Sequence, residues 1–351
     1  MARVGIGIEP TLGQPTGIGR YTAGLLAALR AVAPEHDYVA LGPARQRVMR
    51  TDRRLQWQQY GLPEAARRAH VDVLHVTGFD APLRSPVPVV LTVHDLIGVL
   101  RPKDHPVVSR MYWGRWLPRT VRRADAVIAV SESTRRDVAA RCGVAASDIT
   151  VVHPGVAGWF TPPSAETVDG VRQRHDLRHP YLLFVGTTEP RKGLDTLLAG
   201  FSALCGRFPH DLVLVGPLTR ALPAVPGSIP PGRVRVLGYV PDADLPSLYA
   251  GAGVVVLPSR VEGFGFPVVE AMACGAPVVC TPAGAMAEVT DGAALLFEPD
   301  DASALAEAVT RLIETPALAR AMRSAGARRA ERFDWRRAAA ETARIYTTVA
   351  R

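Results

Sequence analysis

The feature that most constrains the fold is a series of short apolar segments that alternate with longer stretches of helical pattern. The short segments are rich in Val, Leu and Ile and do not alternate between apolar and polar residues. Such segments are typical of strands buried on both faces of a parallel sheet. Helices between parallel strands complete βαβ units, so the sequence predicts an α/β fold with doubly wound sheets. The expected strands are RVGIGI, YVAL, DVLHV, PVVLTV, DAVIAV, ITVV, YLLFVG, DLVLVG, VRVLG, GVVVLP and PVVCT.

The strand series is interrupted once, near residues 154–163, where Pro and Gly are frequent and a Pro-Pro pair occurs. A chain of 351 residues is also long for a single core. We therefore expect two Rossmann-like domains with a cleft between them, of residues 1–157 and 158–334. A last helix, residues 335–351, could pack on either domain, and packing back on the N-terminal domain is one expectation.

Composition excludes several classes of protein. A hydrophobic content of 48% with 21% charged residues is typical of a folded soluble protein. The four cysteines have no ligand spacing, which favours reduced thiols in a cytosol. We find no signal-peptide pattern and no apolar run of the ~18 residues that a membrane helix needs. The expected location is therefore cytoplasmic.

Basic residues are concentrated between Arg101 and Arg141, where ten basic residues stand against four acidic ones, with Tyr112, Trp113 and Trp116 in the same stretch. This mixture suits an anionic membrane surface or an acidic partner. The simpler interpretation is a solvated basic helix with packed aromatic residues. Peripheral contact with the inner face of a membrane is therefore one of two interpretations.

Three loops have the strand–loop–helix pattern that binds phosphate in open α/β sheets. In the first, after RVGIGI, Gly17 and Gly19 would let the backbone approach a ligand, and Arg20 is expected to open a helix. The loop matches the dinucleotide fingerprint only in part, because Thr22 replaces its last glycine. A tight turn is the alternative.

The second loop, VGTTEPRKGLD, places Arg191 and Lys192 directly before a helix that Gly193 is expected to start. Two cations there oppose the helix dipole, which costs a few tenths of a kcal/mol unless an anion binds between them. Arginine also offers a planar fork that suits a phosphate. This loop therefore predicts a diphosphate site.

In the third loop, EGFGFPVVE, a Gly-Phe-Gly-Phe turn separates Glu262 from Glu270. Pro267 is expected at the first position of a helix that ends near Cys274, which places Glu270 in its first turn. N–H groups at this helix start would stabilise a phosphate. The two carboxylates would accept hydrogen bonds from vicinal hydroxyls, which suggests ribose at one end and a sugar at the other.

Together these residues resemble the retaining glycosyltransferases of family 4, which have the GT-B fold of two Rossmann-like domains facing across a cleft. EGFGFPVVEAMACGAPVV carries the family's Glu-x7-Glu element, and GTTEPRKGLD is its second strong signal. PTGIGRYTAGLL, VHDLIGVLRP, ADAVIAVSESTRRDV and LGYVPDADLPSLYAGA match in the same order. The resemblance covers essentially the whole chain and is strongest to bacterial mannosyltransferases of polysaccharide assembly.

The resemblance implies a role for each matching position. Arg191 and Lys192 would bind the donor diphosphate, and Glu270 would hold the ribose. His94 would face the donor sugar, and it forms the expected catalytic set with Arg191, Lys192 and Glu262. The further implied donor contacts are the loop of Gly17 and Gly19 at the diphosphate, the backbone around Gly238 and Val240 at the base, and Glu262, Gly263, Phe264, Gly265 and Phe266 at the donor sugar.

The resemblance also implies the chemistry. Cations and helix N–H groups would stabilise the leaving diphosphate, and front-face attack would retain the anomeric configuration. The best donor is GDP-mannose, with UDP-sugars as the alternative. The acceptor would be a hydroxyl of a glycan, a lipid-linked sugar or a small molecule. We expect no cofactor and no metal, because Asp242 and Asp244, which spell a DxD pattern, fit the start of a helix. No nucleic-acid partner is expected.

Two other functions share parts of this pattern. An NAD-dependent oxidoreductase would explain two Rossmann-like sheets, but the full glycine fingerprint and its acidic partner are missing. A non-catalytic nucleotide-sugar-binding subunit of the same fold would retain nucleotide binding and lose turnover. The residues expected to carry the chemistry are all present, which favours an enzyme.

Overall fold

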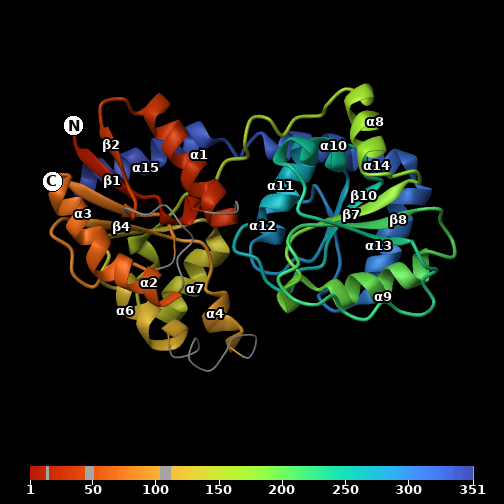
Figure 1. Cartoon of the computed structure of the whole chain (residues 1–351), viewed down its shortest axis with the longest axis horizontal. Helices are drawn as coiled ribbons and strands as arrows, with labels where there is room; N and C mark the ends of the chain where they lie inside the picture. The colour runs from red at the N-terminus through yellow and green to blue at the C-terminus, as the bar shows by residue number, and fades with distance from the viewer. Residues whose placement is uncertain (13–15, 44–50, 79, 103–111, 351) are drawn as a thin grey trace. The chain divides into compact units, whose positions relative to one another are not determined.

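The computed structural model describes the chain except for residues 13–15, 44–50, 79, 103–111 and 351. The described residues form two compact units, one of residues 1–157 and 333–351 and the other of residues 158–332 (Figure 1). Each unit is built around one parallel six-stranded sheet with helices on both faces. The α/β, doubly wound fold predicted from the sequence is thereby confirmed.

The first unit has the strand order β2-β1-β3-β4-β5-β6, and every neighbouring pair is parallel. Its chain closes with α15, which packs beside α1 (Figure 1). The elements are β1 (Arg3–Gly7), α1 (Gly17–Val32), β2 (Asp37–Leu41), α2 (Thr51–Gln56), α3 (Leu62–Arg68), β3 (Val73–Val76), β4 (Val89–Val93), α4 (Ile97–Leu100), α6 (Leu117–Val121), β5 (Ala126–Ala129), α7 (Glu132–Cys142), β6 (Ile149–Val151) and α15 (Trp335–Val349).

The two faces of the first sheet differ in chemistry. Leu74 and Val76 of β3 and Leu91 of β4 join α3, α6 and α7 in one apolar core. Because successive side chains of a strand point to opposite faces, His75 and Thr92 point away from this core. They lie under α1 and α15, so this second face carries buried polar groups.

The second unit has the strand order β12-β11-β10-β7-β8-β9, again with parallel neighbours throughout. Leu182, Leu212 and Val254 pack with α9 and α13 in an apolar core on one face. The elements are α8 (Ala165–Arg174), β7 (Tyr181–Val185), α9 (Leu194–Leu204), β8 (Asp211–Val215), β9 (Val234–Gly238), α10 (Leu245–Ala250), β10 (Val254–Leu257), α11 (Phe266–Ala273), β11 (Val278–Cys280), α12 (Met286–Thr290), β12 (Leu295–Leu296), α13 (Ala302–Glu314) and α14 (Pro316–Ala330).

Each of the eleven expected strand segments agrees with a strand of the structure, β1 to β11, to within one residue at each end. The exception to the prediction is β12, a strand of two residues, which is too short to leave a readable apolar run. All four cysteines are buried as free thiols. Within the part of the chain that the structure describes, no helix is both long enough and apolar enough to cross a membrane.

Candidate functional site

The second sheet reverses its strand order between β7 and β10, which are neighbours although β8 and β9 lie between them in sequence. In open α/β sheets, ligands bind beyond the carboxyl ends of strands at such a reversal. The loop after β7 contains Arg191 and Lys192, and the loop after β10 contains Glu262. The topology therefore brings two of the sequence-predicted loops to one place within this unit.

Arg191 and Lys192 lie on a short 3-10 turn, Pro190–Lys192, that connects β7 to α9. Gly193 follows with a φ of 67°, and a Cβ there would lie 2.1 Å from the carbonyl oxygen of Pro258. This left-handed residue is the N-cap of α9, which begins at Leu194 and not at Gly193. Glycine is thus required both by the backbone conformation and by the close approach of the β10 loop.

Glu262 is buried and lies between the two cations. Its Oε1 accepts hydrogen bonds from Lys192 Nζ at 2.5 Å and from Ser259 Oγ at 2.7 Å. Its Oε2 lies 3.6 Å from Arg191 Nη1. Burial alone would raise the pKa of this carboxyl, but the charges of Lys192 and Arg191 and these hydrogen bonds outweigh it and hold the pKa below its usual value. Glu262 is therefore ionised at neutral pH.

Arg191 contacts a second carboxylate, that of the half-exposed Glu189, at 2.7 Å. A guanidinium has five N–H donors and an ammonium three, so each cation can hold several acceptors at once. A diphosphate arriving here would therefore meet cations whose positions are already set by Glu189 and Glu262. Such an arrangement can stabilise an anionic leaving group without first having to organise the cations.

Arg260 holds the Arg191 loop in place, a role that no sequence motif indicates. Its guanidinium donates to Asp195 at 2.7 Å and to Asp300 at 2.6 Å, and also to the carbonyl oxygen of Pro190. Its backbone N–H donates to the carbonyl oxygen of Arg191 at 2.7 Å. The loop after β10 is therefore tied to the loop after β7 by one side chain and one backbone bond.

Glu270 lies on α11, which starts at Phe266 with Gly265 as N-cap. The sequence-based placement of Glu270 in the first turn was wrong: the helix begins one residue earlier than expected, and Pro267 occupies its second position. The left-handed Gly265, with a φ of 86°, allows this earlier start. Glu270 is 2% exposed, and its Oε2 accepts a hydrogen bond from Tyr249 OH at 2.8 Å.

The remaining predicted donor contacts of this unit lie on the same edge of the sheet. In the turn of Gly263 to Phe266, Phe264 is buried and packs edge-on against Phe266, with ring centroids 5.1 Å apart. Gly238 ends β9 with a φ of 67°, and Val240 behind it is buried. The side chain between these two residues, Tyr239, is 49% exposed.

In the first unit, the glycine loop differs from the expectation. The helix α1 begins at Gly17, not at Arg20, with Thr16 as N-cap. The Thr16 hydroxyl accepts the N–H of Gly19 at 3.1 Å, and a Cβ on Gly19 would lie 2.6 Å from the carbonyl oxygen of Pro10. Glycine at position 19 is thus explained by close packing in this unit, and residues 13–15 of the same loop lie outside the described residues.

His94 follows β4, and its Nε2 lies 2.7 Å from the carbonyl oxygen of Thr77. A carbonyl oxygen only accepts, so Nε2 carries the proton. Burial lowers the pKa of His94 to about 4 despite this hydrogen bond. At neutral pH the imidazole is therefore uncharged, with Nδ1 as its acceptor nitrogen. It can accept a hydrogen bond from a hydroxyl but is poorly suited to act as a proton donor.

A cluster around Asp80 was missed by the sequence analysis. Asp80 follows β3 and is fully buried; it accepts hydrogen bonds from Tyr112 OH at 2.8 Å and Trp116 Nε1 at 3.0 Å. Gln59 contacts the same carboxylate at 3.4 Å. Burial raises the pKa of Asp80, although these bonds oppose the rise. Since the first sheet reverses its order between β1 and β3, the cluster lies at the reversal of that sheet. A lone Asp in a loop with one glycine carries no readable motif.

Asp242 and Asp244 begin a 3-10 turn before α10. The carboxylate of Asp244 is buried and bonded to Arg174 and to His175, the latter at 2.9 Å. It therefore anchors the end of α8. Within the described ranges, no group of three or more His, Cys, Asp or Glu side chains is arranged to hold a metal ion.

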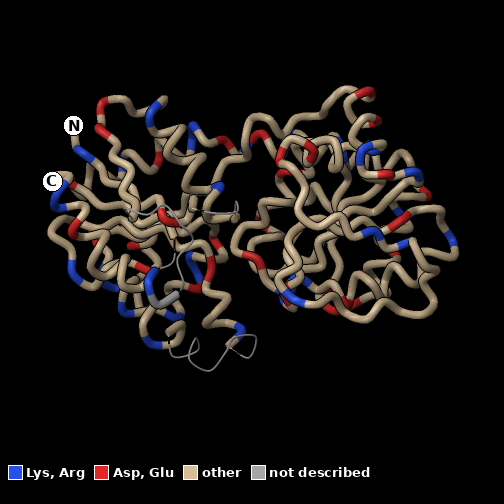
Figure 2. Tube along the Cα trace, viewed as in Figure 1, with Lys and Arg blue, Asp and Glu red and all other residues tan. Residues whose placement is uncertain are grey.

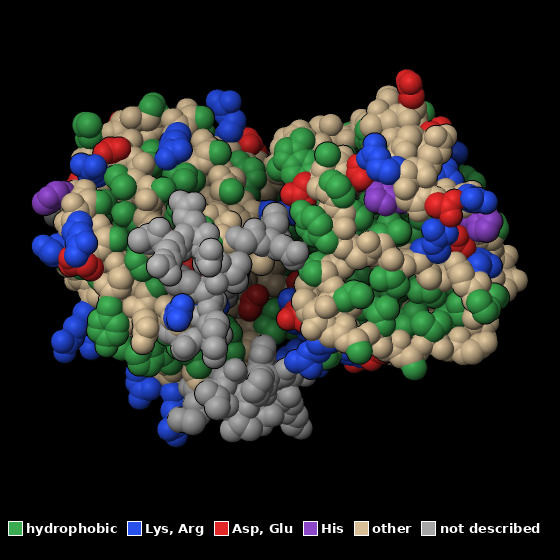
Figure 3. All heavy atoms as spheres, in the orientation of Figure 1, with side chains coloured by type: hydrophobic (Ala, Val, Ile, Leu, Met, Phe, Trp, Pro, Cys, Tyr) green, Lys and Arg blue, Asp and Glu red, His purple; other side chains and the backbone are tan. Residues whose placement is uncertain are grey.

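The basic segment is partly visible, since residues 103–111 lie outside the described residues. Arg115, Arg119, Arg122 and Arg123 are all exposed on and beside α6. Figure 2 marks Lys and Arg positions in blue along the trace of this unit, and Figure 3 shows Lys and Arg side chains on its surface. The aromatic residues of the segment are less exposed: Trp113 packs against the apolar core, and Trp116 bonds to Asp80. The exposed part of the described segment is therefore charged and not aromatic.

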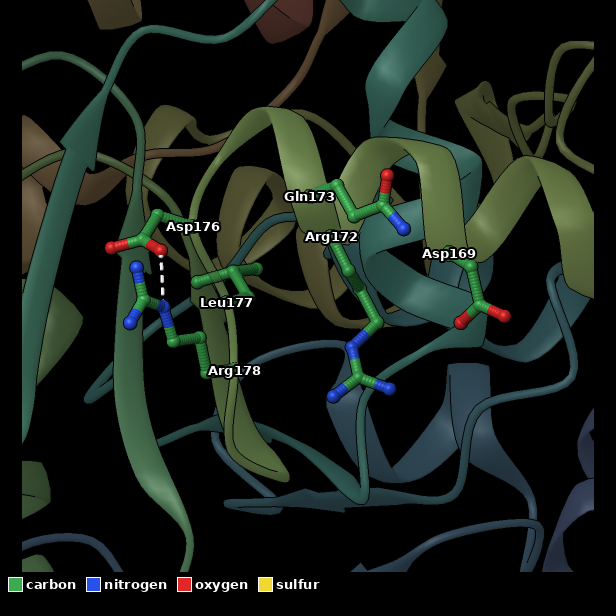
Figure 4. A pocket seen from close by; sticks show the side chains of 6 residues that line it. All are labelled: Asp169, Arg172, Gln173, Asp176, Leu177 and Arg178. Carbon is green, nitrogen blue, oxygen red and sulfur yellow. Dashed lines mark hydrogen bonds and ion pairs between the residues drawn. The ribbon is translucent and has the colours of Figure 1, made fainter.

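A cavity of about 340 Å³ lies elsewhere in the second unit, beside α8 (Figure 4). Its lining residues are Asp169, Arg172, Gln173, Asp176, Leu177 and Arg178. Asp176 and Arg178 form an ion pair at 2.7 Å across its wall. These residues precede β7, so the cavity lies at the amino ends of the strands, the edge opposite to Arg191 and Glu262. It is separate from the candidate site.

Comparisons with known proteins agree with this geometry. Two family models match, "Glycosyltransferase Family 4" over residues 15–157 and "Glycosyl transferases group 1" over residues 179–315. The chain is 31% identical to O-antigen chain mannosyltransferase B of Escherichia coli, over 73% of this chain and 69% of that protein. It is 30% identical to the MMP alpha-(1->4)-mannosyltransferase of Mycolicibacterium hassiacum, over 80% and 72%. The solved structure of Anabaena Alr3699/HepE with UDP-glucose superposes with a TM-score of 0.76 at 19% identity, over 99% and 100%.

Proposed function

The chain belongs to glycosyltransferase family 4, and on that premise we propose that it transfers a hexose from a nucleotide-sugar donor to an acceptor hydroxyl, with retention of the anomeric configuration. The observation that supports this most is the cluster of Arg191, Lys192 and Glu262 at the reversal of the second sheet. Two cations held at the carboxyl ends of β7 and β10 are suited to a diphosphate leaving group.

The proposed reaction breaks the bond between the anomeric carbon and the donor phosphate. Negative charge then develops on the diphosphate, and Arg191 and Lys192 stabilise it. The acceptor hydroxyl attacks the same face of the sugar, and the leaving phosphate oxygen takes its proton. Glu262 is ionised, and its Oε1 already accepts hydrogen bonds from Lys192 and Ser259. In the proposed reaction it accepts hydrogen bonds from hydroxyls of the donor sugar and does not act as a nucleophile. No resident metal or cofactor enters this scheme.

Mannose from GDP-mannose is the first donor that we propose. Both relatives described above are mannosyltransferases, and they are the most direct support for this sugar. A UDP-sugar is the second candidate, since a protein of the same fold has been solved with UDP-glucose. The two donors share the diphosphate, so Arg191 and Lys192 serve both, and the base distinguishes them.

The test is calorimetric binding of GDP-, UDP-, dTDP- and ADP-sugars, each followed by slow donor hydrolysis, with and without EDTA. We expect one nucleotide family to bind and to be hydrolysed at a rate that EDTA does not change. Lys192→Ala should weaken binding by about 10- to 150-fold, the loss of a charged hydrogen bond. Arg178→Ala is the matched control, because it removes a cation of the same unit at the opposite edge of the sheet.

Each result has a distinct meaning. No binding of any nucleotide sugar would contradict the proposed donor site. Binding without hydrolysis or transfer would favour a nucleotide-sugar-binding subunit that has lost turnover. Loss of turnover in EDTA would contradict metal independence alone. Product anomeric configuration, read by NMR, decides whether the transfer retains or inverts.

A further inference from the structure

A continuous polar chain crosses the buried face of the first sheet, between the strands and the two helices that cover them. It starts at Tyr346 on α15, whose hydroxyl lies 2.6 Å from Nδ1 of His75 on β3. The other nitrogen of His75, Nε2, lies 2.8 Å from the hydroxyl of Thr92 on β4. The Thr92 hydroxyl in turn lies 3.2 Å from the hydroxyl of Tyr21 on α1.

Every member of this chain is fully buried: Tyr346, His75, Thr92 and Tyr21 are each 0% exposed. Buried polar groups cost free energy unless they are hydrogen-bonded, and apolar residues would have filled the same layer at lower risk. The opposite face of the same strands shows this, since Leu74, Val76 and Leu91 form an ordinary apolar core. The polar layer is therefore unusual for this sheet and calls for a reason.

This hydrogen-bonded series ends at Tyr21, which packs against His94. The aromatic ring of Tyr21 packs edge-on against the His94 imidazole, with ring centroids 4.6 Å apart and planes at 88°. On its other side, His94 is held by the carbonyl oxygen of Thr77. The hydroxyl of Thr77 is itself bonded to Thr22, the residue next to Tyr21 on α1. Residues of α1 therefore contact both groups that hold His94, the Tyr21 ring directly and Thr77 through Thr22.

We propose that Tyr346 and His75 are positioning residues that hold Tyr21 in place and thereby fix the orientation of the His94 imidazole. The hydrogen-bond directions are consistent in either tautomer of neutral His75. With the proton on Nε2, Tyr346 donates to Nδ1 and the Nε2–H donates to Thr92; with the proton on Nδ1, both directions reverse. Burial keeps both imidazoles neutral, lowering the pKa of His75 to about 3 and that of His94 to about 4. The C-terminal helix, far from His94 in sequence, thus contributes to its geometry.

This inference rests on the proposed function and on the expected contact of His94 with the donor sugar, because orientation matters only if Nδ1 meets a ligand. A ring displaced by a fraction of an ångström would weaken that contact in the transition state. Tyr346→Phe removes only the first hydroxyl of the chain. Thr92→Val removes the central hydroxyl with little change of shape. It is the second test variant, used if Tyr346→Phe folds poorly.

The matched control is Tyr38→Phe. Tyr38 is buried beside Tyr346, with ring centroids 6.5 Å apart, and its hydroxyl donates to the carbonyl oxygen of Ala33 at 3.1 Å. This substitution also removes one buried hydroxyl under α15, but Tyr38 does not belong to the polar chain. An effect that both variants share reflects the stability of the protein. An effect seen only in Tyr346→Phe reflects loss of the hydrogen-bonded series from Tyr346 to Tyr21.

The first measurement is the imidazole ¹⁵N–¹H spectrum of the ligand-free protein, with the His94 signals identified by their loss in His94→Gln. We expect Tyr346→Phe to shift or broaden the His94 signals and Tyr38→Phe to leave them in place. Unchanged His94 signals in both Tyr346→Phe and Thr92→Val would overturn the proposal. This readout needs no donor, so it stands whether or not the proposed function holds.

The second measurement is a double-mutant cycle on hydrolysis of GDP-mannose or of the donor that binds in its place. Tyr346→Phe should lower kcat about fivefold, equivalent to one buried hydrogen bond, and leave KM nearly unchanged. In the His94→Gln background the same substitution should have no effect. Additive effects would contradict action through His94. Full activity of His94→Gln would instead contradict the proposed role of His94 at the donor.

Discussion

Glu262 shows how one side chain can organise two others. Its buried carboxylate pairs with both Lys192 and Arg191, and it also accepts a hydrogen bond from the hydroxyl of Ser259. The Ser259 carbonyl oxygen is in turn bonded by the hydroxyl of Thr281 at 2.5 Å. A buried ion pair adds little net stability over apolar residues, but removing one partner strands the other charge. Glu262 is thus both a predicted donor contact and the residue that keeps Lys192 in position.

Replacing Glu262 with Gln should destabilise the protein by about 3 kcal/mol at pH 7, because Lys192 would keep a buried charge without its carboxylate. The folded pKa of Glu262 is depressed, so its contribution to stability is complete above the usual carboxyl pKa of 4.5. That contribution is lost as the pH falls from there through the folded pKa. The difference between wild type and Glu262→Gln in urea unfolding should therefore shrink below about pH 4.5.

Glu64→Gln provides the comparison for this experiment. Glu64 also pairs with two cations, Arg67 and Arg68, but on the surface of α3. An exposed pair is screened by water and contributes little, so this variant should unfold nearly as the wild type does. Equal losses in the two variants, or a Glu262→Gln deficit that persists at low pH, would be incompatible with the buried ion pair.

At the scale of elements, the loops after β7 and β10 act as one assembly, because Arg260 joins them. Arg260 is not among the residues expected to touch the donor, yet it contacts Asp195 at the start of α9 and Asp300 before α13. The position of Arg191 and Lys192 therefore depends on a side chain from a different loop. Loops carry binding residues best when a rigid scaffold sets their geometry.

Arg260→Ala is expected to weaken nucleotide-sugar binding about tenfold, because the 3-10 turn that carries Arg191 loses its side-chain anchor and keeps only the backbone bond. Arg233→Ala is the control: this arginine clamps Asp211 and the carbonyl oxygens of Phe208 and His210 at the opposite edge of the same sheet. Both variants should lose stability, but only Arg260→Ala should lose affinity. Calorimetric titration and thermal unfolding of both variants separate the two effects. Equal affinity of Arg260→Ala and Arg233→Ala for the nucleotide sugar would contradict the role of Arg260 in holding the Arg191 loop.

The boundaries of the elements show the limits of sequence patterns. Rules for proline at a helix start placed α11 at Pro267, whereas the left-handed Gly265 starts it at Phe266. Likewise α1 starts at Gly17, because Thr16 provides a capping hydroxyl, and not at Arg20. In both cases the element itself was predicted and its first turn was not. A cap depends on backbone angles that neighbouring segments select, so a local pattern fixes a helix start only to within a few residues.

At the scale of the whole molecule, the net charge of +8 is unevenly distributed. The exposed arginines on and beside α6 form a basic surface of one unit, defined here by Arg115, Arg119, Arg122 and Arg123. A polybasic surface gains about 1 kcal/mol per charge at an anionic membrane. A lipid-linked acceptor would be presented at such a membrane, which makes peripheral binding through this surface our proposal.

Flotation with equimolar phosphatidylcholine and phosphatidylglycerol vesicles tests it. At low salt we expect the protein to float with these vesicles, to remain unbound with pure phosphatidylcholine, and to be released by 0.5 M salt, since screening weakens the attraction. Arg119→Glu with Arg123→Glu should abolish flotation. The control is Arg320→Glu with Arg328→Glu, two exposed residues of α14. This double variant changes the net charge by the same amount and should still float. Equal loss in both double variants would indicate net charge alone, and no flotation of wild type would end the proposal.

The class of fold, eleven of the strands and the loops that carry Arg191, Lys192 and Glu262 are predictable from the sequence, because they depend on local hydrophobic pattern and on residue types at fixed spacing. The order of the strands, which brings the loops after β7 and β10 together, is a property of the assembled sheet. The same holds for Arg260, for Asp80 and for the chain from Tyr346 to His94. Their partners lie tens to hundreds of residues away, and a buried polar contact between distant residues leaves no periodic signal in the sequence. Only packing the helices on the sheets decided which of these groups meet.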